Sequence, residues 1–162
     1  MLTAHAPAGY ITAKLLYSLK PCHISSKKWA ILGAISGLIP DFDMFWFYLV
    51  DNGTVHHHRY FTHYPIVWLV ILSFALLLRV YKRNAFTSIM LLFAVNGNVH
   101  IFLDSIVGDI WLFMPWYDRA YSIFTVPAHY DWWVWNFILH WSFSLELLIW
   151  CIAFVFLSKK VA

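Results

Sequence analysis

Three short clusters of histidine and aspartate interrupt otherwise apolar sequence. The first is the Pro-Asp-Phe-Asp run at 40–43, the second is the histidine-rich run at 56–65, and the third is His100 followed by Asp104. Imidazole and carboxylate groups are common ligands of divalent cations such as zinc. The residue types therefore predict a site for a hard or borderline divalent cation.

The first cluster places two carboxylates inside an apolar segment. Such groups are costly in lipid unless they are paired or bound to a cation, and Pro40 interrupts a helix at this point. We expect Asp41 to bind a metal, and Asp43 to orient a ligand or to act as a general base. The alternative is that Asp41 and Asp43 mark the outer end of a short helix next to water.

The second cluster contains four histidines and one arginine. We expect His58 and His63 to be ligands, and His56 and His57 to lie in an interfacial loop without a ligand role. Arg59 is predicted to clamp the phosphate of an anionic substrate, since a guanidinium group binds phosphate in a bidentate manner. The alternative for the whole run is a histidine-rich loop at the membrane surface.

The third cluster has the spacing of one helix face. His100 and Asp104 are four residues apart, so their side chains lie on the same side of a helix. They are either two further ligands or a buried hydrogen-bonded pair. Because three separate segments place polar groups at one level of an apolar protein, the ligand interpretation is favoured.

The composition indicates which class of protein positions these clusters. The chain has 162 residues, of which 62% are hydrophobic and 12% are charged, against roughly 45–50% and about 25% in soluble domains. A soluble enzyme and a disordered chain are therefore excluded, and two cysteines are too few for a disulfide scaffold. A net charge of +3 gives no support for a nucleic-acid partner. We expect residues 1–162 to form one membrane-embedded domain.

The apolar segments predict an all-α membrane bundle of about four transmembrane helices. Each segment is close to the ~20 residues that a spanning helix needs. The segments are 29–50, 64–81, 86–107 and 132–157. Residues 2–20 predict a further, half-embedded helix that brings His5 to the depth of Asp41, or alternatively a helix in the plane of the cytoplasmic surface. For His140 and Glu146, in the last segment, we expect a role as structural partners or as side chains that support the metal ligands from behind.

The distribution of basic residues predicts the orientation. The segments before, between and after the four spans carry 4, 1, 3, 1 and 2 lysines or arginines. The positive-inside rule then places the region 14–28, the loop 79–85 and the C-terminus in the cytoplasm. The loops 51–63 and 108–131 face the other side, and the metal clusters lie toward it.

The order of the motifs resembles that of a known family. His5 with Gly9, PDxD at 40–43, HRxxTH at 58–63 and HxxxD at 100–104 are similar to motifs of the LexA-regulated, membrane-bound metal-dependent hydrolase family. The resemblance covers residues 5–104 and implies a small bacterial inner-membrane protein with a divalent metal. It implies these candidate ligands: His5, Asp41, His58, His63, His100 and Asp104.

Together these observations predict a membrane-bound metal-dependent hydrolase. We expect one or two ions, with zinc preferred, and a phosphoester of a lipid or lipid-linked molecule near the outer leaflet as substrate. The depth of the clusters in the bilayer favours a lipid substrate. The alternatives are a metal or ion transporter and a non-catalytic membrane protein with a structural metal.

Overall fold

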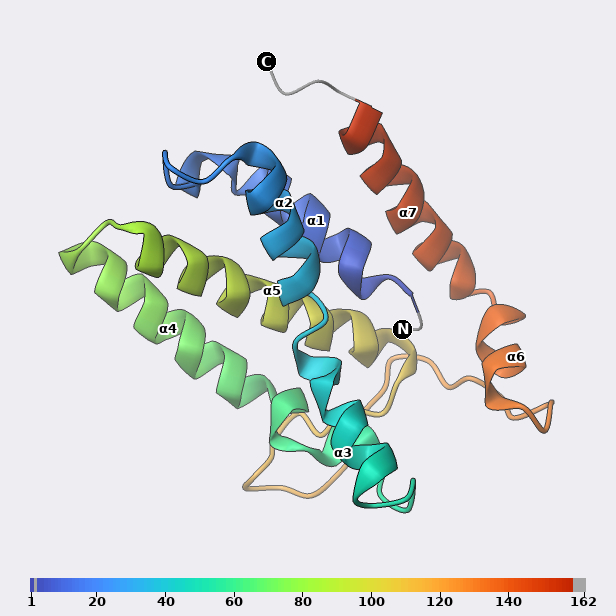
Figure 1. Cartoon of the computed structure of the whole chain (residues 1–162). Helices are drawn as coiled ribbons and strands as arrows, with labels where there is room; N and C mark the ends of the chain where they lie inside the picture. Colours follow the sequence, from blue (N-terminus) through green and yellow to red (C-terminus); the bar gives the residue numbers. More distant parts are fainter. Residues whose placement is uncertain (2, 159–162) are drawn as a thin grey trace.

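The computed structural model describes Met1 and residues 3–158, which form helices and connecting loops (Figure 1). These residues contain no β-strand, apart from an isolated bridge between Ile110 and Tyr121. The prediction of an all-helical protein is confirmed. The α-helices are α1 (His5–Leu15), α2 (Ser26–Ser36), α3 (Asp43–Leu49), α4 (Pro65–Tyr81), α5 (Ala85–Val107), α6 (Trp133–Ile138) and α7 (Phe143–Ser158). Short 3-10 helices are η1 (Tyr17–Leu19), η2 (Pro40–Phe42), η3 (His57–Arg59) and η4 (Phe61–His63).

The number of membrane crossings is only partly supported. Within the described part of the chain, α5, with 23 residues, is the single helix long and apolar enough to cross a membrane alone. Helix α2 and the segment Pro40–Leu49 pass the same test together, but they are bent by 58°. Helices α4 and α7 are apolar and shorter, with 17 and 16 residues. The structure thus has helices in all four predicted segments, and four crossings are not confirmed.

Two of the predicted spans are broken for local reasons. Pro40 lies at the first position of η2, where its missing N–H ends the regular helix and lets α3 start in a new direction. The segment 132–157 is divided into α6 and α7 by a turn at residues 139–142. There the Nδ1 atom of His140 lies 2.8 Å from the Oγ atom of Ser142, a local contact that competes with helix continuation.

Glycines let α1 and α2 approach each other closely. A Cβ atom at Gly33 would lie 2.4 Å from the Cβ of Ala13, and one at Gly37 would lie 2.3 Å from the carbonyl oxygen of His5. Gly9 faces the backbone of Gly33 in the same contact. The small residues therefore bring the start of α1, with His5, against the end of α2.

Helix α5 runs through the middle of the assembly and contacts α1, α2 and α4 (Figure 1). The amide of Asn96 donates hydrogen bonds to the carbonyl of Gly33 and, at 2.5 Å, to the hydroxyl of Ser36. On the other face of α5, Gly97 leaves room for the buried ring of Trp68. Because α5 is fixed on two sides, the position of His100 and Asp104 near its end is fixed as well.

Candidate metal centre

Four side chains from three elements bring their donor atoms together. They are Asp41 of η2, His63 of η4, and His100 and Asp104 of α5, and one donor atom from each lies within 4.8 Å of all the others. The Nε2 atoms of His63 and His100 are each 3.5 Å from Oδ1 of Asp41. They are 3.8 and 3.0 Å from Oδ2 of Asp104. Residues up to 63 positions apart in sequence thus form one compact His/Asp cluster, and these four are hereafter called the four-donor cluster.

Three of the four side chains of this cluster are buried, and each has a donor atom without a hydrogen-bond partner in the described part of the chain. Among the described residues, Nε2 of His63, Nε2 of His100 and Oδ2 of Asp104 have none. Burying polar atoms without partners costs about 1–3 kcal/mol each, so their convergence requires a compensating ligand. Two donors bound tetrahedrally to one zinc ion at about 2.0–2.1 Å lie roughly 3.4 Å apart. The spacing and chemistry of the four donors fit a single divalent cation.

In both His63 and His100, the second ring nitrogen, Nδ1, is held by a hydrogen-bond acceptor. Nδ1 of His100 lies 2.7 Å from the carbonyl oxygen of Gly37, and Nδ1 of His63 lies 2.7 Å from Oδ2 of Asp43. Donation from Nδ1 fixes the tautomer in which Nε2 carries a free lone pair. The same carboxylate oxygen of Asp43 accepts a hydrogen bond from the hydroxyl of Thr62. These contacts aim both Nε2 atoms at the centre of the cluster.

His58 and His5 lie at the edge of the four-donor cluster. Nε2 of His58 is 3.7 Å from Oδ2 of Asp104, and its Nδ1 is 2.8 Å from the carbonyl oxygen of Asp109. A Cβ atom at Gly108 would lie 2.8 Å from this ring, so the glycine admits it. His5 stacks on His100 with ring centroids 3.7 Å apart, and its Nε2 is 3.1 Å from the other oxygen of Asp104. The structure therefore brings both predicted ligands next to Asp104.

Sequence reasoning placed His57 outside the site, and the structure places it inside. Its ring centroid is 4.0 Å from that of His58 and 5.3 Å from that of His63. Burial lowers the pKa of His57 to about 4 and also lowers that of His58, so both rings are neutral at pH 7. The signal in the sequence was the tandem of histidines, since two of the three faces of the short helix η3 then carry imidazole rings.

Arg59 points away from the cluster. Its guanidinium donates to Oδ2 of Asp118 at 2.5 Å and lies 5.4 Å from the ring of Trp111. Successive residues of a 3-10 helix are separated by a third of a turn. With His57 and His58 directed inward, Arg59 is left on the exposed side of η3. The predicted phosphate contact would require Arg59 to exchange Asp118 for the substrate.

Glu146 belongs to neither group of clustered donors among the described residues. It is buried in α7 and accepts hydrogen bonds from the backbone N–H of Thr3, at 2.5 Å, and from its hydroxyl, at 2.8 Å. These contacts join α7 to the segment before α1.

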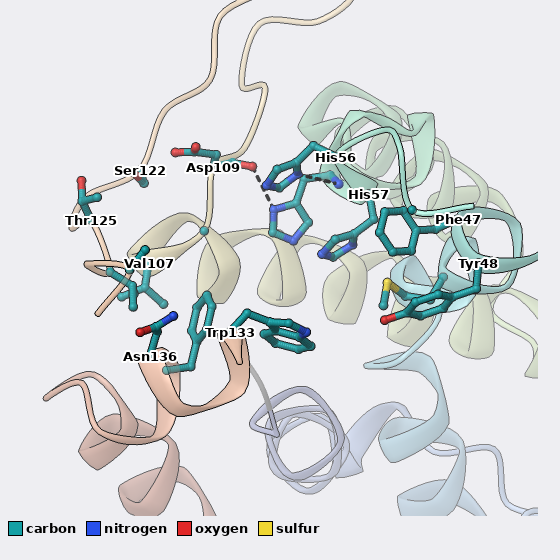
Figure 2. Close-up of a pocket in the computed structure, with 17 residues that line it drawn as sticks. Phe47, Tyr48, His56, His57, Val107, Asp109, Ser122, Thr125, Trp133 and Asn136 are labelled. Carbon is teal, nitrogen blue, oxygen red and sulfur yellow. Dashed lines mark hydrogen bonds between the residues drawn. The ribbon is translucent and has the colours of Figure 1, made fainter. Parts of the chain in front are cut away.

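A small cavity reaches the four-donor cluster, and a larger cavity adjoins the small one. A cavity of about 200 Å³ is lined by both Asp41 and Asp104 and by His57 and His58. A larger cavity of about 610 Å³ adjoins it and shares part of its lining, including His57 and His58 (Figure 2). The larger cavity has apolar walls from α3, α5 and α6, and a polar side from the loops and from Asn136 of α6. Its lining includes Phe47, Tyr48, Val107, Trp133 and Phe137 on the apolar side and Asp109, Ser122, Thr125 and Asn136 on the polar side.

Comparison with known proteins identifies a family over the full length of the chain. The family model described as YdjM inner membrane protein matches residues 1–162. No curated protein and no solved structure matches the chain significantly.

Proposed function

The chain belongs to the YdjM inner membrane protein family, and from this premise and the converging donors we propose that it is a metal-dependent hydrolase. The observation that carries the proposal is the set of buried, unpartnered donor atoms on His63, His100 and Asp104. The proposed substrate is a phosphoester of a lipid or lipid-linked molecule. The proposed metal is zinc or a similar borderline divalent cation.

In this proposal, Asp41, His63, His100 and Asp104 hold the ion. A bound divalent cation supplies Lewis acidity and lowers the pKa of a bound water toward about 7. Gly37 and Asp43 orient the two imidazoles through their Nδ1 atoms. His5 supports the site by contacting Oδ1 of Asp104, while Oδ2 lies next to His63 and His100.

The cavities favour a catalytic metal over a structural one. A structural site is closed by protein ligands, whereas a catalytic site keeps a position open for water or substrate. Here Asp41 and Asp104 line a cavity of about 200 Å³. This space adjoins the larger cavity, whose apolar walls suit the hydrocarbon part of a lipid and whose polar loop side suits its headgroup.

The membrane setting supports a substrate drawn from the bilayer. Many large apolar side chains of α3, α4 and α7 are exposed, as expected for helices that contact lipid. The alternating count of basic residues supports four crossings, with the cluster on the periplasmic side.

The test is the metal content and hydrolytic activity of the purified protein. We expect stoichiometric zinc or a related ion in the wild type and loss of the ion from His100→Ala and Asp104→Asn. His23→Ala is the matched control, because this exposed histidine lies between α1 and α2, away from the donors. Hydrolysis of phospholipid mono- and diesters in mixed micelles should follow the metal content. Equal metal content in His100→Ala and wild type would refute the assignment of the donors. A full complement of metal with no hydrolysis of any lipid phosphoester would favour a structural metal or a transport site.

A further inference from the structure

A second group of donors lies beside the four-donor cluster. His57, His58 and His63 each offer a ring nitrogen within 4.8 Å of the other two. The four-donor cluster uses Nε2 of His63, and one ring nitrogen binds one ion, so His57 and His58 remain available for a different cation. Nε2 of His58 is free for this purpose because its Nδ1 contacts the carbonyl of Asp109.

A buried carboxylate oxygen lies beside this second group, next to His57. Asp43 is only 8% exposed, and its two oxygens have different surroundings. Oδ2 contacts His63 and Thr62, whereas Oδ1 is buried and has no hydrogen-bond partner among the described residues. Oδ1 lies 4.0 Å from Nδ1 of His57, which is also buried and unpartnered. A buried carboxylate oxygen and a buried imidazole nitrogen that face each other beyond hydrogen-bond distance are both left unsatisfied, and a cation between them would satisfy both.

From these contacts we propose a second divalent-cation position, formed by His57, His58 and Oδ1 of Asp43. It extends the proposed function from one ion to two. Three protein ligands of the imidazole and carboxylate type leave a fourth position open, as in catalytic zinc sites. His57 and His58 also line the 200 Å³ cavity together with Asp41 and Asp104. Both cation positions therefore border the same space, as required for two ions that act on one phosphoester.

The position of η3 explains why His57 and not His56 takes this role. The Nδ1 atom of His56 accepts a hydrogen bond from the backbone N–H of His58 and so caps the 3-10 turn. His56 stacks on His57 with parallel rings, at a centroid distance of 5.6 Å. His57 is thus held between His56 on one side and the buried carboxylate of Asp43 on the other.

The test is a metal count on single and double variants. Full-length protein in detergent is stripped with a chelator and titrated with Zn²⁺, and the bound zinc is counted after removal of excess. We expect two ions per chain in the wild type and in His23→Ala. We expect one ion in His57→Ala and one in His100→Ala. The double variant that carries both substitutions should bind none. His57→Gln repeats the measurement with a side chain of similar volume, and thermal unfolding shows whether each variant is folded.

The possible failures are distinguishable. One ion in the wild type, retained in His57→Ala and lost in His100→Ala, overturns the second position and leaves the proposed metal centre intact. Two ions in folded His57→Ala also overturn it, because His57 would then be a packing residue. No zinc in the wild type overturns both proposals.

Discussion

Nδ1 of His63 and Oδ2 of Asp43 are joined by a buried contact of 2.7 Å that links η4 to the start of α3 at the candidate metal centre. The carboxylate fixes the imidazole in the tautomer that presents Nε2 to Asp41 and Asp104. Asp43→Ala is expected to weaken metal binding about 10–100-fold, the usual effect of removing an orienting partner of a metal ligand. Competition with a chelating indicator measures this change.

The control for this variant is Asp51→Ala. Asp51 also accepts a hydrogen bond from a side chain of the same loop, the hydroxyl of Tyr60, but it does not belong to either group of donors. Unchanged metal affinity and metal count in Asp43→Ala would show that His63 is positioned by packing alone, and would remove Asp43 from the proposed second position.

Close packing of α1 on α2 predicts a loss of stability for Gly33→Leu. A Cβ at residue 33 already conflicts with Ala13 and with the carbonyl of Gly9, so the helices must separate. Overpacking costs about 1–3 kcal/mol, and we expect more for this larger side chain. Thermal unfolding in detergent measures the change. Ile35→Leu, on the exposed face of the same helix, should unfold like the wild type, and equal stability of both variants would argue against the glycine contact.

The sequence predicted the parts of the site that depend on local patterns. The i, i+4 spacing of His100 and Asp104 placed both on one face of a helix, and they do lie on α5 with Nε2 and Oδ2 3.0 Å apart. The cost of a carboxylate in an apolar segment identified Asp41 as a residue that needs a partner, and the structure gives it two imidazoles. These inferences required only the helical period and the physical chemistry of charge.

The rest depends on how loops fold, which the spacing of residues does not determine. His57 and Arg59 are two residues apart, yet the turn at η3 directs one inward and the other toward Asp118. A uniform apolar pattern likewise could not show that residues 132–157 form two helices, because the turn rests on a contact between His140 and Ser142. Hydropathy averaged over 20 residues does not detect such local hydrogen bonds.

The orientation in the membrane gives a prediction that is independent of any metal. A reporter fused after Lys160 and one inserted in the loop 79–85 should both report the cytoplasm. A reporter within residues 51–54 or near Asp118 should report the periplasm. The reason is the preference of lysine and arginine for cytoplasmic loops. If the 51–54 reporter is cytoplasmic, the centre faces inward, and a substrate from the outer leaflet is excluded.

The contact between Arg59 and Asp118 predicts opposite effects of two substitutions on substrate binding. If Arg59 exchanges Asp118 for a phosphate, Arg59→Gln should raise KM for an anionic phosphoester. Asp118→Asn frees the guanidinium and should lower KM. Both groups are about half exposed, and exposed ion pairs contribute about 0–1 kcal/mol, so each change should be at most about fivefold. Metal content should not change in either variant. If both variants have the KM of the wild type, Arg59 does not take part in substrate binding.

The large cavity predicts selectivity for the hydrocarbon part of the substrate. Ala128 lines the 610 Å³ cavity and does not line the smaller cavity that touches the metal-binding carboxylates. Ala128→Phe should therefore fill space needed by a lipid and leave the bound ions in place. We expect KM to rise about tenfold or more for a long-chain phosphoester, and to stay the same for a short-chain analogue of the same headgroup. Ala120→Phe, in the same loop but outside the cavity lining, is the matched control. If Ala128→Phe impairs both substrates equally, this cavity does not hold the hydrocarbon chain of the substrate. A bulky residue should then be introduced in the apolar groove formed by Met44, Phe45, Tyr48 and Leu49.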